Sequence, residues 1–182
     1  MNSGRVAIRY ARGLFKFAKE QGLAEAFYAD ALTLIQILKD SELLSELINN
    51  PLIVSDKKVD VLRNAIADAI NPAFYEFISI IVKKGRFEYL LNSLLLFRDL
   101  YRFEKGIVEV QVESANSLTD NELNTIDSII QSHFNKKTEL TVTIKPQLIA
   151  GFILIVEGKI MDYSVTGQLL QFKKSFGLTQ SN

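Results

Sequence analysis

The chain has few residues whose types and spacing could support catalysis. It contains one histidine, His133, and no cysteine in 182 residues, which leaves no thiolate nucleophile and no thiolate metal ligand. A serine triad would need His133 as its base, yet the sequence lacks the Gly-x-Ser-x-Gly pattern that presents such a serine. His133 lies late on the polar flank of a predicted helix, which is typical of an ordinary surface residue.

Asp162 and Ser164 are the remaining pair with reactive side chains. They stand where a predicted strand ends and a predicted helix begins, and we interpret them as acceptors for backbone donors at that junction. The other carboxylates are scattered over predicted polar faces, and the glycines lack phosphate-loop spacing. We therefore predict a protein that is not an enzyme and uses no cofactor or metal. A small enzyme with a site of perturbed carboxylates is one alternative.

Positive charge is also too sparse for a nucleic-acid binder. The 21 basic residues balance 21 acidic ones, so no overall field attracts a polyanion. No aromatic side chains alternate with the clustered bases, as stacking on nucleobases requires. The clusters are Lys83, Lys84 and Arg86, and then Lys136, Lys137, Lys173 and Lys174.

A helix over residues 5–20 is more apolar than a surface helix needs to be. At about 100° per residue its apolar side chains cover roughly 200°, about twice what is needed to pack on one core. The remaining stripe is basic and has Glu20 as its one acid. This pattern favours a second helix with an acidic flank docking beside the bases; deep packing inside the chain's own bundle would give the same arc. The basic residues are Arg5, Arg9, Arg12, Lys16 and Lys19.

The predicted helix over residues 72–84 has the same excess. Its apolar arc spans roughly 220°, with Glu76, Ser79 and Lys83 marking the wet side. A helix buried in the middle of a bundle would show an equally wide apolar arc. Two such helices and no catalytic residues indicate an adaptor that binds other proteins.

The remaining elements predict an α+β fold. Helical spacing recurs over residues 23–40, 41–48, 55–70 and 88–104. At Gly106 the apolar period changes to that of strands, with a capping box at Thr119 and Glu122 and a hairpin turn at 157–159. We predict a six-helix N-terminal bundle over 1–105 and a small α/β domain over 106–182. The longest nearly apolar run, 148–156, is too short to span a bilayer, so another protein must hold this chain at any membrane.

Several short motifs, in their order and spacing, resemble the delta subunit family of the F-type ATP synthase, which includes the mitochondrial oligomycin-sensitivity-conferring protein. The most specific runs from Leu148 to Phe152 and on to Asp162-Tyr163-Ser164-Val165, Gly167 and Leu169. The others are the opening helix with Ala7, Tyr10, Ala11, Leu14, Phe15 and Ala18, then Asn50-Pro51-Leu52 with Lys57 and Lys58, Gly85-Arg86, and Ser114-Ala115 with Leu118-Thr119. Gly13, Ala150 and Thr166 depart from the family pattern.

The resemblance implies a non-catalytic stator subunit that links the catalytic head to the peripheral stalk. The N-terminal domain would hold the N-terminal helix of the alpha subunit between the first and fifth helices, and the C-terminal domain would bind the b subunit. With no transit peptide evident, we expect the cytoplasmic face of a bacterial cell membrane, with membrane attachment only through the complex. A helical regulatory adaptor outside the synthase is the other alternative.

Candidate contact residues follow from the resemblance and the apolar arcs. For the alpha-subunit helix we predict apolar contacts by Ile8, Phe15, Phe77, Ile78 and Ile81, with Arg12, Lys16 and Lys19 steering acidic residues of the incoming helix. For the b subunit we predict the last helix, through Val165, Leu169, Phe172 and Phe176.

Overall fold

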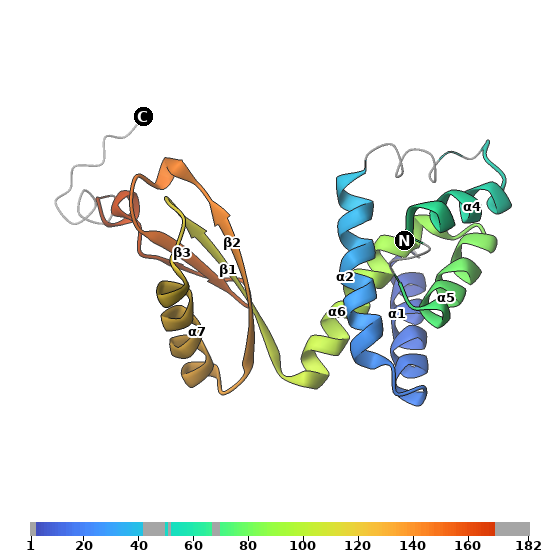
Figure 1. Ribbon diagram of the computed structural model, residues 1–182, viewed down its shortest axis with the longest axis horizontal. Helices are drawn as coiled ribbons and strands as arrows, with labels where there is room; N and C mark the ends of the chain where they lie inside the picture. The colour runs from blue at the N-terminus through green and yellow to red at the C-terminus, as the bar shows by residue number, and fades with distance from the viewer. Residues whose placement is uncertain (1–2, 42–49, 51, 67–69, 170–182) are drawn as a thin grey trace. The chain divides into compact units, whose positions relative to one another are not determined.

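The computed structural model describes residues 3–41, 50, 52–66 and 70–169 and has an α+β fold (Figure 1). Its contacts divide the chain into two compact units, Met1–Glu104 and Lys105–Asn182. The described elements of the first unit are helices, and those of the second are strands and one long helix with shorter helical turns. The predicted fold class is therefore confirmed at the level of α+β.

The helices of the first unit begin and end close to the predicted positions. They are α1 (Ser3–Glu20), α2 (Ala24–Asp40), α4 (Ser55–Ile66), α5 (Pro72–Lys83), the 3₁₀ turn η1 (Phe87–Tyr89) and α6 (Leu90–Lys105). The helix predicted over 41–48 lies outside the described residues, apart from Ser41, which ends α2.

Large aromatic side chains form the centre of this unit. Phe27, Phe74 and Phe97 are fully buried, and the rings of Phe27 and Phe74 meet edge to face with centroids 5.3 Å apart. Along α1 the buried residues include three alanines, Ala7, Ala11 and Ala18. Their small size lets the backbone of α1 approach the other helices closely.

Local sequence signals explain where α5 starts and stops. The side chain of Asn71 accepts a hydrogen bond from the Ala73 amide at 2.9 Å. Pro72 occupies the first helical position, where a backbone N–H would have no partner within the helix, so the missing N–H of proline costs no hydrogen bond. Gly85 follows the helix with φ of 64°, a left-handed conformation that favours glycine. Asp30 of α2 accepts from the Asn71 amide at 3.0 Å, which ties the start of α5 to α2.

The second unit is a sheet with the order β2-β1-β3-β4. Its elements are β1 (Ile107–Ser114), α7 (Asp120–Phe134), β2 (Lys137–Ile144), the 3₁₀ turn η2 (Pro146–Leu148), β3 (Phe152–Val156) and β4 (Lys159–Asp162). β1 and β2 run parallel, which requires the crossover that α7 supplies, whereas β3 is antiparallel to both of its neighbours.

One face of this sheet packs against α7. Val108, Val110 and Val112 alternate along β1 and meet Ile126 and Ile130 of α7, with Leu154 and Val156 of β3 completing the cluster. The predicted capping box starts α7: Thr119 accepts from the Glu122 amide while the Glu122 carboxylate accepts from the Thr119 amide. The predicted hairpin is also present, with Glu157 and Gly158 at positive φ between β3 and β4.

In the described part of the chain, no helix combines the length and the apolar character that a membrane-spanning segment needs.

Candidate partner-binding surfaces

One flank of α1 borders α5. A Cβ atom added to Gly13 would lie 3.8 Å from Cζ of Phe77, an ordinary contact distance. One turn after Gly13 on α1, the ring of Phe17 stacks on the same Phe77 ring, with centroids 6.4 Å apart and planes 19° apart. Phe77 is half-buried, and the exposed Gly13 places no side chain beside its ring. Ile80, one turn along α5, is 48% exposed and continues this apolar edge.

The opposite flank of α1 borders α6. The ring of Phe15 meets that of Phe97 with centroids 6.2 Å apart. The Lys19 ammonium lies 5.5 Å from the centre of the Phe15 ring and forms an ion pair with Glu104 at the end of α6. Phe15 and Lys19 therefore help to hold α1 on α6. Ile8 is 40% exposed and falls on this same flank, because it lies seven residues before Phe15.

The basic stripe of α1 lies between these two flanks and faces solvent. Lys16 pairs with Glu20 at 3.6 Å. Such an exposed i,i+4 pair is worth about 0.3–0.5 kcal/mol, so a partner could displace it at little cost. Arg9 and Lys16 are four residues before and three after Gly13, which places them beside it on the helix surface. Arg12 is exposed on the same stripe.

The structure separates the residues predicted to contact the alpha-subunit helix. Ile78 and Ile81 are at most 1% exposed, so they are core residues that no partner reaches on this surface. Phe15, Ile8 and Lys19 lie on the α6 flank, whereas Phe77 lies on the α5 flank. Arg12 and Lys16 are exposed between the two.

Sequence reasoning missed Gly13 and Ile80 as surface residues of the α1–α5 edge. Gly13 gives a readable signal, because glycine inside a helix costs up to about 1 kcal/mol relative to alanine and no positive φ requires it here. Ile80 gives none, since a broad apolar arc does not reveal which of its members face solvent.

The junction between β4 and the following helix has the predicted architecture. Asp162 Oδ1 accepts from the Ser164 amide at 2.9 Å and from its hydroxyl at 2.6 Å. The Ser164 oxygen in turn accepts from the Gly167 amide at 3.0 Å, which is N-capping geometry. The hydroxyl of Ser164, followed by its amide, lowers the pKa of Asp162. The interpretation of this pair as backbone acceptors is confirmed.

The helix that follows is described over residues 165–169. Val165 is 39% exposed and Leu169 is 52% exposed, so both are accessible to a partner. Phe172 and Phe176, the other residues predicted to contact the b subunit, lie outside the described residues.

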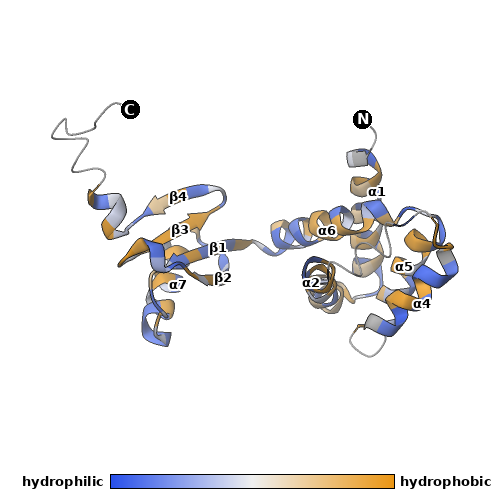
Figure 2. Cartoon of the chain, turned by 90° about the horizontal axis from the view of Figure 1, so that it is seen from above, coloured by the Kyte–Doolittle hydropathy of each residue, from blue (hydrophilic) through white to orange (hydrophobic). Residues whose placement is uncertain are grey.

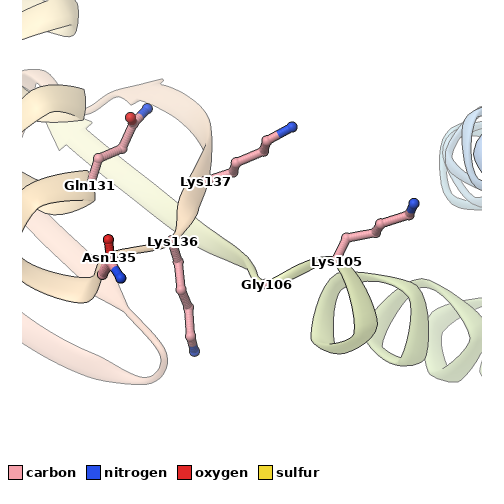
Figure 3. A pocket seen from close by; sticks show the side chains of 6 residues that line it. All are labelled: Lys105, Gly106, Gln131, Asn135, Lys136 and Lys137. Carbon is pink, nitrogen blue, oxygen red and sulfur yellow. The ribbon is translucent and has the colours of Figure 1, made fainter.

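The two lysines at the junction between α7 and β2 do not form an anion cradle. Lys136 and Lys137 line a polar cavity of about 360 Å³ together with Lys105, Gly106, Gln131 and Asn135. Figure 3 shows the side chains of Lys136 and Lys137 pointing to opposite sides of the ribbon. Lys136 pairs with Glu157 at 3.2 Å, so its charge is already offset. Within the described residues, no group of histidine, cysteine and carboxylate side chains has the arrangement of a metal site.

Comparisons with known proteins give matches that cover nearly the full length of this chain. The chain is 31% identical over 175 residues to ATP synthase subunit delta of Carboxydothermus hydrogenoformans, covering 96% of this chain and 98% of that protein. It is 28% identical over 182 residues to the corresponding subunit of Symbiobacterium thermophilum, covering 100% and 98%. A chain in the structure of the Toxoplasma gondii mitochondrial ATP synthase hexamer has the same fold, with a TM-score of 0.68, 24% identity and coverage of 96% and 98%.

The family model described as "ATP synthase delta (OSCP) subunit" matches residues 6–176. Such a match over almost the whole chain explains the missing catalytic constellation, because these subunits have a structural role in the enzyme complex. The chain belongs to the ATP synthase delta (OSCP) subunit family, the non-catalytic stator components of the peripheral stalk of F-type ATP synthases.

Proposed function

We propose that this protein joins the catalytic head of an F-type ATP synthase to its peripheral stalk by holding one helix in each unit. The N-terminal unit, a six-helix bundle in this proposal, takes the N-terminal helix of the alpha subunit. The C-terminal unit takes the b subunit. A stator that resists rotary torque needs affinity and stiffness, and neither requires an active site.

The α1–α5 edge is the observation that carries the first half of the proposal. Gly13 places no side chain beside the half-buried Phe77 ring, and we infer an apolar notch there that the exposed Ile80 extends along α5. A large apolar side chain of an incoming helix fits such a notch as a knob fits a hole. Burying this surface contributes about 25 cal/mol per Å².

The charge next to this edge selects the kind of helix. Arg9, Arg12 and Lys16 are exposed along the stripe of α1 that adjoins Gly13. A helix with acidic residues beside its apolar stripe would therefore be attracted and oriented. Of the residues first predicted for this contact, Arg12, Lys16 and Phe77 belong to the proposed surface.

The proposal also places the protein in the cell. As a member of its family it is part of the membrane-associated ATP synthase complex. We place it at the cytoplasmic face of a bacterial cell membrane, attached only through other subunits, because the relatives with similar sequences include bacterial delta subunits.

Calorimetric titration with a synthetic peptide that carries the N-terminal sequence of the alpha subunit tests the head contact. We expect one-to-one binding with a negative heat-capacity change, as burial of apolar surface requires. Ile80→Asp should weaken binding about tenfold or more. Phe103→Asp is the matched control, because Phe103 is 87% exposed but lies on α6.

Two results would contradict the proposal. Equal losses from Ile80→Asp and Phe103→Asp would remove the α1–α5 edge as the site. A folded chain that binds neither the peptide nor the intact catalytic head would favour a regulatory adaptor instead.

A further inference from the structure

The C-terminal unit has an apolar cavity of about 320 Å³ beside α7. Its apolar lining comes from Leu118, from Ile126 and Ile129 of α7, and from Phe152 at the start of β3. Ile129 is 60% exposed at its rim. An isoleucine that is largely exposed next to an apolar cavity is typical of a contact surface for another molecule.

Hydrogen bonds fix which side of α7 this cavity occupies. The Thr138 hydroxyl of β2 donates to the Asp127 carboxylate, and the Gln131 amide contacts the same hydroxyl at 3.4 Å. These contacts bind one flank of α7 to β2. Figure 2 shows α7 beside β1 and β2, with β4 at the opposite edge of the sheet. The cavity opens on the flank of α7 that faces away from β2, toward Phe152 of β3.

The part of this sheet face that no described element covers, over β3 and β4, has the width of a helix. Two strands span about 10 Å, which equals the diameter of a helix with its side chains. Phe152 of β3 and Met161 of β4 are half-buried on this face, and Tyr163 just after β4 is 51% exposed. A helix laid along α7 would cover these three residues and bury Ile129.

Charges at the two ends of this groove give a docking helix a direction. Glu122, in the first turn of α7, lines the cavity. Lys159, at the first position of β4, lies at the hairpin end, opposite Val156 in the register. A helix with a basic residue at the Glu122 end and an acidic residue at the Lys159 end would match both.

We propose that the groove between α7 and β3 seats one amphipathic helix of the b subunit, with its apolar stripe on Ile126, Ile129 and Phe152. The inference rests on the proposed function and names the face of the C-terminal unit that performs it. Val165 and Leu169 are exposed on the following helix, and this proposal does not require them.

Single cysteines test the groove cleanly, because the chain has none of its own. Ile129→Cys places a thiol at the groove. Ile160→Cys is the matched control, since Ile160 is 69% exposed and pairs with Ile155, whose side chain is on the opposite face from Leu154. Labelling by a thiol-reactive fluorophore is measured in the full chain, with and without a synthetic peptide that carries the last residues of the b subunit. Binding of this peptide to the unmodified chain is measured independently by calorimetry.

The peptide should slow labelling at position 129 by about tenfold or more and leave position 160 unchanged. Ile129→Asp should abolish peptide binding while the circular dichroism spectrum stays the same. Protection at 160 instead of 129 would overturn the groove assignment while leaving the proposed function intact.

Other occupants would give different results. Slow labelling of Ile129→Cys in the free chain would mean that another part of this chain already covers the groove. If the labelling rate also depended on protein concentration, a second copy of the chain would be the cover. Either result overturns the inference. No binding of the peptide to the unmodified chain would overturn the stalk assignment and this inference with it.

Discussion

Gly13 of α1 lies directly against the ring of Phe77 of α5: a Cβ at Gly13 would be 3.8 Å from Cζ. The chain's own packing therefore does not exclude a small side chain here, and glycine lowers helix stability. The glycine is explained if the space above Phe77 is used by another molecule.

Replacing Gly13 should separate stability from binding. Gly13→Ala should stabilise the chain by up to about 1 kcal/mol, because alanine is the better helix former and its methyl group fits. Gly13→Leu should leave stability close to that of Gly13→Ala yet weaken binding of the alpha-subunit peptide by about tenfold or more, because it fills the notch. Urea unfolding and calorimetry measure the two effects. Undiminished binding by Gly13→Leu would show that the notch is not used.

The basic stripe should control the association rate. Arg12→Glu combined with Lys16→Glu should slow association with the head and reduce its salt dependence, because exposed charges act mainly by steering. Stopped-flow mixing over a range of ionic strength measures this. Lys39→Glu, an exposed base in the last turn of α2, is the control and should have little effect. Unchanged binding and salt dependence in the double variant would remove the steering role.

The sequence predicted the positions of elements better than it predicted the exposed residues. Asn71 with Pro72, Thr119 with Glu122, and Glu157 with Gly158 act through contacts only a few residues apart, so a pattern is sufficient to locate them. Which members of an apolar arc face a partner depends on distant helices. Ile78 is buried and Ile80 is exposed, although both belong to the same arc.

The α1 contacts illustrate the same limit. Phe15 and Phe17 both lie on the predicted apolar arc, yet Phe15 packs on Phe97 of α6 and Phe17 on Phe77 of α5. The sequence predicts a wide arc. Its two edges turned out to serve two different neighbouring helices, which no periodicity within α1 can distinguish.

Gly151 should be among the least replaceable residues of the C-terminal unit. Its φ is 85°, and an added Cβ would lie 2.4 Å from the backbone oxygen of Tyr163. Gly151→Ala should lower the free energy of unfolding by about 2 kcal/mol or more, because backbone must move. Gly158→Ala is the matched control: its φ is 79° but nothing lies within 4 Å, so only the conformational cost of about 1–2 kcal/mol remains. Equal losses in urea unfolding would contradict the steric explanation.

Asp162 should make the C-terminal unit sensitive to acid. Its pKa is lowered by the hydroxyl and amide of Ser164, so the folded state binds a proton less readily than the unfolded state does. The stabilisation is therefore present above the unfolded-state pKa of about 4 and is lost as the pH falls through the lower folded-state value. Asp162→Asn mimics the protonated form in charge, so it should destabilise the chain at pH 7 and have a smaller effect at about pH 3, which is below the unfolded-state value. Urea midpoints of both proteins at the two pH values measure this difference. If the urea midpoints of the two proteins differed by the same amount at both pH values, Asp162 would act through its shape alone and its charge would contribute nothing.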